Sequence, residues 1–352
     1  KSAAAWADRS PGWVRQVMPD RGASFAYGFT GCPICGARWG TWGSARAAFD
    51  RPGRVECAKG HILPDEMHAD AGTGYTGADG RSHYFVGSYN AWGVETLLFK
   101  IAKPYANIYL LEGDARAGRM AAVILDELAR IYPSCDRGSW DYPSNPPSGR
   151  LNRPWYQVAR VLVHYVDIYD RIFDHPALDE PSAVAGLTRR QNIEKNLLLN
   201  GAKYCHDMSV KQGGLHNGQA DYLRGVLAVG VVLGIPEYIT WPVDGPYGIR
   251  TMLANNVDRD GRYFETSASY AWHTRDLYLT FAEPLLNYRG SLYPDGLNLY
   301  DQPKFESFLL LPQMALVCLG HDATFGDMAP AWSQRRPPYV PPTIWDCRYT
   351  EY

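Results

Sequence analysis

Residues 113–132 read GDARAGRMAAVILDELARIY, and this stretch decides the fold class. Its apolar residues recur at intervals of three and four, which is the spacing of a helix that buries one face. The residues of this stripe are Met120, Val123, Ile124, Leu128 and Ile131. The apolar–polar alternation of a half-buried strand does not occur here. The stretch therefore predicts an amphipathic α-helix.

The same spacing recurs along most of the chain. A second stripe consists of Val158, Val161, Leu162, Tyr165, Ile168 and Tyr169. Prolines and glycines separate the periodic segments. Helices are predicted at about 88–103, 113–132, 154–174, 189–209, 219–234, 246–257, 267–288 and 304–319. Because paired helices in series form solenoids or toroids, we predict an all-α protein built on an incomplete (α/α) toroid, open on one side.

Changes of composition divide the chain into three parts. Residues 1–70 are rich in Gly, Pro, Trp and Cys and show little periodicity, which predicts an irregular N-terminal lobe. Residues 71–330 hold the predicted helices and are expected to form the toroid, after a Gly- and aromatic-rich surface loop at 71–87. Residues 331–352 contain two Pro-Pro pairs, which are typical of a linker. This linker is expected to lead toward a β-rich domain outside the chain.

Charge and hydropathy exclude two classes of partner. The net charge is −2, so the protein has no overall basic field for nucleic acid. No run of 18 apolar residues occurs, so we expect no membrane span. Aromatic residues make up 13% of the chain, which suits a groove for sugar rings as well as an aromatic core. A polyanionic substrate would be bound by local arginines and lysines.

Three cysteines and one histidine have the spacing of a metal site. Cys32 and Cys35 form a Cys-x2-Cys knuckle, and Cys57 and His61 follow it. Three thiolates and one imidazole are a closed ligand set for tetrahedral zinc, so we predict a structural Zn²⁺ in the N-terminal lobe. A disulfide between Cys32 and Cys35, or free thiols, are the alternatives. A catalytic zinc is disfavoured because a closed set leaves no position for substrate.

One candidate catalytic segment reads GGLHNGQ at residues 213–219. It places His216 and Asn217 at the start of the predicted helix at 219–234. The partial positive charge and free N–H groups of a helix N-terminus stabilise an anion and keep an imidazole neutral, as a base requires. The alternative is that Asn217 is the N-cap and His216 a partly buried structural histidine.

The second candidate segment reads DRDGRYFETSASYAWH at residues 258–273. A turn at Asp260-Gly261 leads through a polar and aromatic stretch to a helix that starts near Ser267. Tyr270 begins the apolar stripe that continues at Leu277 and Phe281. Taken alone, this position predicts a core aromatic residue.

Together the two segments resemble the heparinase II/III and oligoalginate lyase group of polysaccharide lyases. In that group an Asn/His motif opens one toroid helix, and an Asp-Gly-x-x-x-Glu-(Ser/Thr) stretch leads to Ser-x-Tyr-(His). The resemblance covers roughly residues 71–320 and is specific mainly at these two motifs. Ala271 replaces the histidine that is common after the tyrosine. The matching residues are His216, Asn217, Asp260, Gly261, Glu265, Thr266, Ser269 and Tyr270.

The resemblance implies cleavage of a uronic-acid polysaccharide by β-elimination. Asn217 would neutralise the uronate carboxylate, His216 would be the base for one C5 configuration, and Tyr270 would be the acid. For the other configuration Tyr270 would serve as both base and acid. An unperturbed phenol has a pKa of about 10, so a neighbouring cation would help it act as a base. Substrate-binding residues are expected to be Arg262, Glu265, His273 and Arg275.

The resemblance also implies a location and a domain partner. We expect a periplasmic or secreted protein, no organic cofactor, and a C-terminal β-sandwich outside this chain. One rival function is a uronyl C5-epimerase, which would use the same base and acid. Another is a non-catalytic glycan-binding toroid. A third is an inverting glycoside hydrolase, for which Asp170, Asp221 and Glu265 are the candidate carboxylates.

Overall fold

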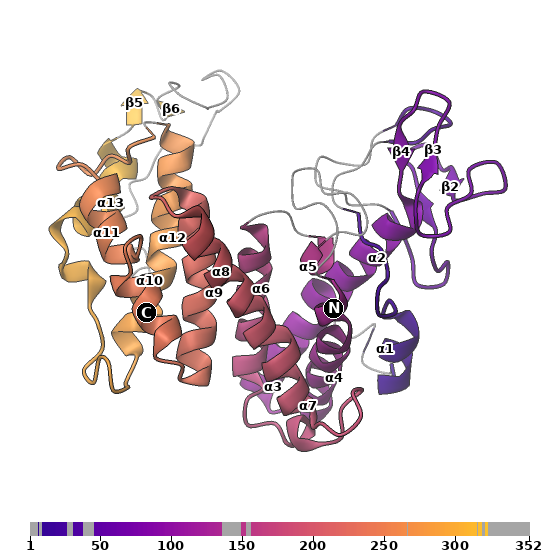
Figure 1. The fold of residues 1–352 in the computed structure, drawn as a ribbon, viewed down its shortest axis with the longest axis horizontal. Helices are drawn as coiled ribbons and strands as arrows, with labels where there is room; N and C mark the ends of the chain where they lie inside the picture. The colour runs from indigo at the N-terminus through magenta and orange to yellow at the C-terminus, as the bar shows by residue number, and fades with distance from the viewer. Residues whose placement is uncertain are drawn as a thin grey trace. The chain divides into compact units, whose positions relative to one another are not determined.

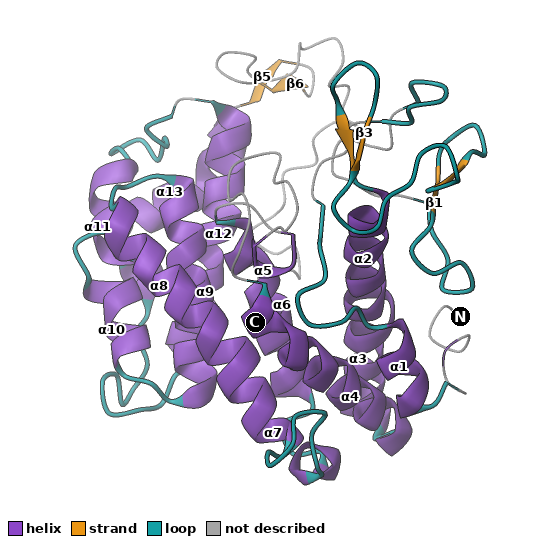
Figure 2. Cartoon of the chain, turned by 45° about the vertical axis from the view of Figure 1, so that its right-hand side comes forward, coloured by secondary structure: helices purple, strands orange, loops and turns teal. Residues whose placement is uncertain are grey.

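The fold is mostly helical, which confirms the predicted all-α class. The computed structural model describes residues 6, 9–26, 31–37, 46–135, 149–152, 156–265, 267–314, 316–318 and 321–322. Figure 2 shows helices as the dominant element, with a few short strands. Closure into a toroid stays a prediction, and the predicted linker at 331–352 lies outside the described residues. None of the described helices combines the length and apolar character that crossing a bilayer requires.

The chain divides into two compact units, residues 1–204 and residues 205–352. Apart from α1, the helices of the first unit fall within the predicted 71–330 region, and α1 lies in the part that was predicted to be irregular. Figure 1 labels the helices and strands. The helices of the first unit are α1 (Pro11–Val17), α2 (Phe85–Glu95), α3 (Lys103–Glu112), α4 (Ala115–Ile131), α5 (Gly149–Asn152), α6 (Gln157–Arg171) and α7 (Arg189–Asn192). Its hairpins are β1 (Val55–Glu56) with β2 (Ile62–Leu63), and β3 (Tyr75–Thr76) with β4 (Ser82–His83).

The helix predicted at 113–132 is confirmed as α4. The Asp114 side chain caps it by accepting hydrogen bonds from the N–H groups of Arg116 and Ala117, at 2.8 and 3.3 Å. Such a cap satisfies N–H groups that have no partner within the helix. All five residues of the apolar stripe are buried. Helix α4 packs against α3 (Figure 1), and it is buried along its whole length from Met120 to Ile131.

The helix predicted at 88–103 is longer than expected. A π-helical segment, η2 (Thr96–Ala102), joins α2 to α3, so the chain stays helical from Phe85 to Glu112. A second π-helical segment, η5 (Ile193–Leu199), joins α7 to α8 (Asn200–Gln212). The prediction of a surface loop at 71–87 is wrong in part, because the β3–β4 hairpin and the start of α2 lie there.

The second unit contains the remaining helices. They are the end of α8, α9 (Asn217–Leu233), α10 (Glu237–Asp244), α11 (Ile249–Asn256), α12 (Ala268–Asn287) and α13 (Pro303–Met314). The sequence did not predict α10, because its internal proline, Pro242, marked a break. The helix predicted at 304–319 is too long. Helix α13 ends at Met314, and the short apolar strand β5 (Leu316–Cys318) pairs instead with β6 (His321–Asp322).

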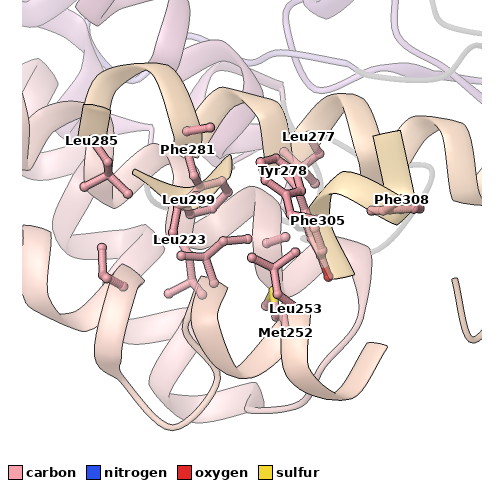
Figure 3. Close-up of a cluster of buried hydrophobic side chains, with 14 of the residues drawn as sticks. Leu223, Met252, Leu253, Leu277, Tyr278, Phe281, Leu285, Leu299, Phe305 and Phe308 are labelled. Atoms are coloured by element: carbon pink, nitrogen blue, oxygen red, sulfur yellow. The ribbon is translucent and has the colours of Figure 1, made fainter. Parts of the chain in front are cut away.

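One hydrophobic cluster holds the second unit together. Figure 3 shows its side chains packed between α9, α11, α12 and α13. Leu277 and Phe281, two of the three residues of the predicted α12 stripe, are fully or almost fully buried in it. Burial of large apolar side chains on this scale contributes roughly 1.5–3 kcal/mol each. The cluster therefore fixes the N-terminal ends of α9 and α12, which carry the candidate catalytic residues.

A tight turn before α12 provides a stability test. Gly261 has φ +79°, and a Cβ atom at this position would collide with the carbonyl group of Ser307. We expect Gly261→Ala to lower the free energy of unfolding by about 2–4 kcal/mol, since it adds backbone strain to overpacking. Gly234 has a similar φ of +66° but open space around it, so Gly234→Ala should cost only about 1–2 kcal/mol. Urea unfolding measures both, and equal losses would contradict the steric argument.

Candidate active site and metal centre

The four predicted metal ligands come together in the N-terminal lobe. Nδ1 of His61 lies 3.3 Å from Sγ of Cys57 and 3.7 Å from Sγ of Cys32. The sulfur atoms of Cys35 and Cys57 are 3.8 Å apart. Around a tetrahedral zinc ion, such ligand atoms would be separated by about 3.8 Å for two sulfurs and about 3.6 Å for sulfur and nitrogen. The four residues can hold a metal ion, and all four ligand atoms lie within 4.8 Å of one another.

Two short loops bring these ligands together. The N–H of Cys32 donates to the carbonyl of Ala37, and the N–H of Gly36 returns to the carbonyl of Cys32, both at 2.8 Å. In the second loop, the N–H of Cys57 donates to the carbonyl of His61 at 3.0 Å. This second loop closes the β1–β2 hairpin, so the backbone positions both of its ligands.

The ligands are also part of the lobe's small core. Cys32 and Cys57 are buried in a cluster with Val55, Leu63, Phe85 and Tyr89. Phe85 and Tyr89 belong to α2, so the metal-binding loops pack directly on that helix. With so few apolar residues, a cluster of this size contributes little stability by itself. A bound ion would therefore supply much of the lobe's order.

The thiols of the cluster differ in their ease of ionisation. Burial raises the pKa of Cys32 to about 11. Burial also acts to raise the pKa of Cys57, but the backbone N–H groups of Lys59 and His61 outweigh it and lower this pKa to about 7. A thiolate at Cys57 is the form that binds a metal ion.

His216 forms the N-cap of α9, a role that the sequence suggested for Asn217. Its Nδ1 atom accepts a hydrogen bond from the backbone N–H of Gln219 at 3.2 Å. Burial lowers the pKa of the His216 imidazole, so the ring is neutral near pH 7. Asn217 is the first residue of the helix, and its Oδ1 accepts from the N–H of Gly218 at 3.0 Å. Both side chains are partly exposed.

A buried asparagine connects the start of α9 to α12. Nδ2 of Asn256 donates to the carbonyl of Leu215 at 2.6 Å and to the hydroxyl of Tyr278 at 3.0 Å. Leu215 directly precedes His216, and Tyr278 lies in the third turn of α12. The segment that holds His216 is therefore fixed to the middle of α12.

A buried tyrosine makes a second connection between the same two helices. The Tyr263 hydroxyl lies near the Thr274 hydroxyl and the backbone N–H of Asn217, although neither approach has the geometry of a regular hydrogen bond. Burial raises the pKa of Tyr263, and the charge of Glu265 adds to this effect. Thr274 is one turn along α12 from Tyr270, on the same helix face. The start of α9 therefore lies near the second turn of α12.

The turn that precedes α12 carries Arg262 and Glu265. Its loop closes with hydrogen bonds from the N–H of Asp258 to the carbonyl of Arg262, at 2.9 Å, and from the N–H of Phe264 to the carbonyl of Asn256, at 3.0 Å. The Arg262 side chain is exposed, whereas the Glu265 carboxyl is partly buried. Burial raises the pKa of Glu265. Among the described residues, none donates a hydrogen bond to this carboxyl.

The remaining predicted site residues lie on α12. Tyr270 is 36% exposed, unlike the rest of its stripe, so its ring reaches the surface where the buried cluster ends. His273 is exposed on the next turn. Arg275 is engaged by Asp276, with its Nη2 atom 2.6 Å from the carboxylate. Thr266 and the side chain of Ser269, which belong to the same motif, lie outside the described residues.

The sequence analysis missed the residues that connect the site. Tyr263 lies within the quoted motif but received no role, and Asn256 ends α11 outside it. Both residues are buried and contact residues far away in the sequence, which a local pattern does not reveal. Only Tyr263 had a local signal, as part of the polar and aromatic stretch. Comparison of the sequence with family profiles and with characterised proteins finds no match to either.

Proposed function

We propose that this protein is a polysaccharide lyase that cleaves a uronic-acid polymer by β-elimination and leaves a C4–C5 unsaturated uronate. One observation carries the proposal. His216 and Asn217 open α9, and Asn256 and Tyr263 connect that helix start to Tyr278 and Thr274 of α12, about two turns and one turn beyond the exposed Tyr270. An imidazole, an amide and a phenol at one end of a rigid helix pair are the groups that the elimination needs.

The chemistry requires neutralisation of the uronate carboxylate, because negative charge builds on its oxygens as the C5 proton leaves. The Asn217 amide group is one donor for this role. Glu265, whose pKa is raised by burial, is a second donor when its carboxyl is protonated. His216 and Tyr270 handle the protons at C5 and O4. Each proton-transfer group would contribute about 10²–10⁴-fold in rate.

The cations near the site have different roles in this proposal. Arg262 and His273 are exposed and can meet the acid groups of neighbouring sugars. Arg275 is already paired with Asp276, so its charge is partly used within the protein. A polyanion would bind through these local charges, since the net charge of the chain is −2. We also propose a periplasmic or secreted location and a C-terminal β-sandwich partner domain, on the resemblance alone.

The metal centre has a structural role in this proposal, and we assign zinc to it. Three sulfur ligands and one nitrogen ligand suit Zn²⁺, and the separations fit its tetrahedral geometry. A full set of four protein ligands leaves no position for a substrate oxygen. The ion would therefore hold the lobe rather than take part in the elimination.

The rival hydrolase loses one of its three candidate carboxylates, Asp221. Asp221 is buried, and Arg224 lies 3.4 Å from its carboxylate. An acid that is held in a buried ion pair does not suit proton transfer to a sugar. The epimerase and the non-catalytic binding toroid remain the alternatives that the activity test separates.

The test is a screen of uronic-acid polysaccharides for unsaturated product, in which the ultraviolet absorbance of the new C4–C5 double bond is measured. We expect at least one of alginate, heparan-type or dermatan-type chains to yield it. Each elimination produces one double bond and one new reducing end. Absorbance with no reducing ends beyond these would identify a lyase. Exchange of the C5 proton without absorbance would identify an epimerase, and binding without either change would identify a glycan-binding protein.

A further inference from the structure

The first unit contains a cavity that none of the candidate active-site residues lines. Its volume is about 470 Å³, and small-molecule sites in proteins measure roughly 300–1,000 Å³. Side chains from α1, from the segment after α1, from the loop before β1 and from α2 line it. They include Trp13, Gln16, Asp20, Phe49, Tyr89 and Asn90. Three aromatic rings and three polar groups therefore border one space.

A buried ionic network holds one wall of the cavity in place. The carboxylate of Glu127, on α4, accepts hydrogen bonds from Arg15 at 2.8 Å and from Arg130 at 2.6 Å. Arg130 also donates to the carbonyl of Pro19 at 3.3 Å. Glu127 and Arg130 are both buried, and buried charges that lose a partner are strongly destabilising. The network therefore fixes α1 and the segment after it on α4.

The opposite wall is attached to the same segment. Nδ2 of Asn90, on α2, donates to the carbonyl of Ser24 at 2.8 Å. The Phe49 ring packs edge-on against Trp13, with 5.3 Å between ring centroids, and tilted against Trp92, with 4.7 Å. The loop before β1 is thus held against both helices. A ligand would enter a preformed cavity, which lowers the entropic cost of binding.

Several polar groups of the cavity are available to a ligand. Among the described residues, none makes a hydrogen bond to the side chain of Gln16 or Asp20, or to Oδ1 of Asn90. Burial, with the charge of Asp50, raises the pKa of Tyr89, so its hydroxyl stays protonated at neutral pH and can donate. Amide, carboxylate and phenol groups together can both donate to and accept from hydroxyl groups.

The charges around the cavity disfavour an ionic ligand. Asp20 is the one charged side chain in the lining that the structure describes, and its carboxylate would repel a uronate. The Arg9 guanidinium lies over the Trp13 ring, 5.3 Å from the centroid. It already occupies a ring face that a ligand cation would use, and it would repel that cation. An uncharged ligand avoids both penalties.

We propose that this cavity binds an uncharged hexopyranose and is a second glycan site, separate from α9 and α12. A pyranose has apolar C–H faces that pack against aromatic rings, and a rim of hydroxyl groups that the amides and the carboxylate can bind. The proposed lyase substrate is a uronate, so the two sites would select different sugars. The inference does not rest on the lyase function, because binding alone tests it.

The first test measures the binding of free sugars to the full chain by saturation-transfer nuclear magnetic resonance. Glucose, galactose and mannose are the probes, and the tightest of them is then compared with its uronate and its 2-amino analogue. We expect at least one neutral sugar to bind with a Kd of about 10 mM or below. Each charged analogue should bind at least about tenfold more weakly. Tighter binding of a charged analogue, or no binding of any neutral sugar, would overturn the proposal.

Variants then locate the sugar in the cavity. Gln16→Ala removes an exposed amide of the lining, and we expect binding to weaken about 5–10-fold. Gln212→Ala is the matched control, because it removes an exposed amide at the end of α8, outside the lining. It should leave binding unchanged. Equal effects of the two substitutions would show that the sugar binds elsewhere.

The last variant tests the selection against charge. Asp20→Asn keeps an oxygen acceptor but removes the negative charge, and the exposed position makes a change of fold unexpected. We expect the uronate analogue to bind this variant within about threefold of the neutral sugar. If the native preference for the neutral sugar persists in the variant, Asp20 does not face the ligand and the cavity is not the site.

Discussion

Tyr270→Phe is expected to lower turnover of the uronic-acid substrate by about 10³-fold or more. Under the proposed lyase mechanism, the substitution removes the oxygen that gives a proton to O4, and such a transfer contributes about 10²–10⁴-fold. The ring remains, so the end of the apolar stripe on α12 keeps its packing. We therefore expect the free energy of unfolding to change by no more than about 0.5 kcal/mol, as for other partly exposed positions.

The matched control is Tyr288→Phe. Tyr288 is the C-cap of the same helix, at the opposite end from Tyr270. The substitution therefore removes an equivalent hydroxyl far from the site. We expect it to leave turnover unchanged. Steady-state kinetics at several pH values, together with urea unfolding of both variants, make the comparison. Near-native turnover in Tyr270→Phe would remove the phenol from the mechanism.

The helices could be predicted from the sequence because burial of one face leaves a periodic pattern. The stripes of α4, α6, α9 and α12 each predicted a helix within a few residues of the observed bounds. Helix α10 was missed because Pro242 lies inside it, and a proline usually ends a helix. The continuous helix from Phe85 to Glu112 was missed because its π-helical middle segment shifts the spacing of the buried residues.

The metal ligands could also be predicted, because their chemistry and spacing are local. The candidate active-site residues depended on a resemblance, since His216 and Tyr270 are far apart in the sequence. Asn256 could not be predicted by either route. Its partners, Leu215 and Tyr278, lie 41 and 22 residues away, and nothing near Asn256 in the sequence marks a contact with them. Contacts of this kind are set by the packing of three helices rather than by a motif.

Removal of the metal ion is expected to have the largest effect on stability. Cys57→Ala deletes the ligand that contacts both His61 and Cys35, at 3.3 and 3.8 Å, and three ligands hold zinc far more weakly than four. We expect the zinc content to fall from one ion per chain to near zero. Because the free energy of metal binding is also free energy of folding, the lobe should lose more than about 4 kcal/mol.

The control for this variant is Cys135→Ala. Cys135 is also buried, and its sulfur lies 3.6 Å from the Ile131 carbonyl oxygen. The Cys135→Ala variant should keep one zinc ion per chain. Metal analysis and limited proteolysis between residues 31 and 63 separate the two variants.

Treatment with a chelator distinguishes a structural from a catalytic role of the ion. If a chelator abolishes turnover while the lobe stays protected from protease, the ion is catalytic, because a structural ion cannot be removed without loosening the loops that its ligands connect.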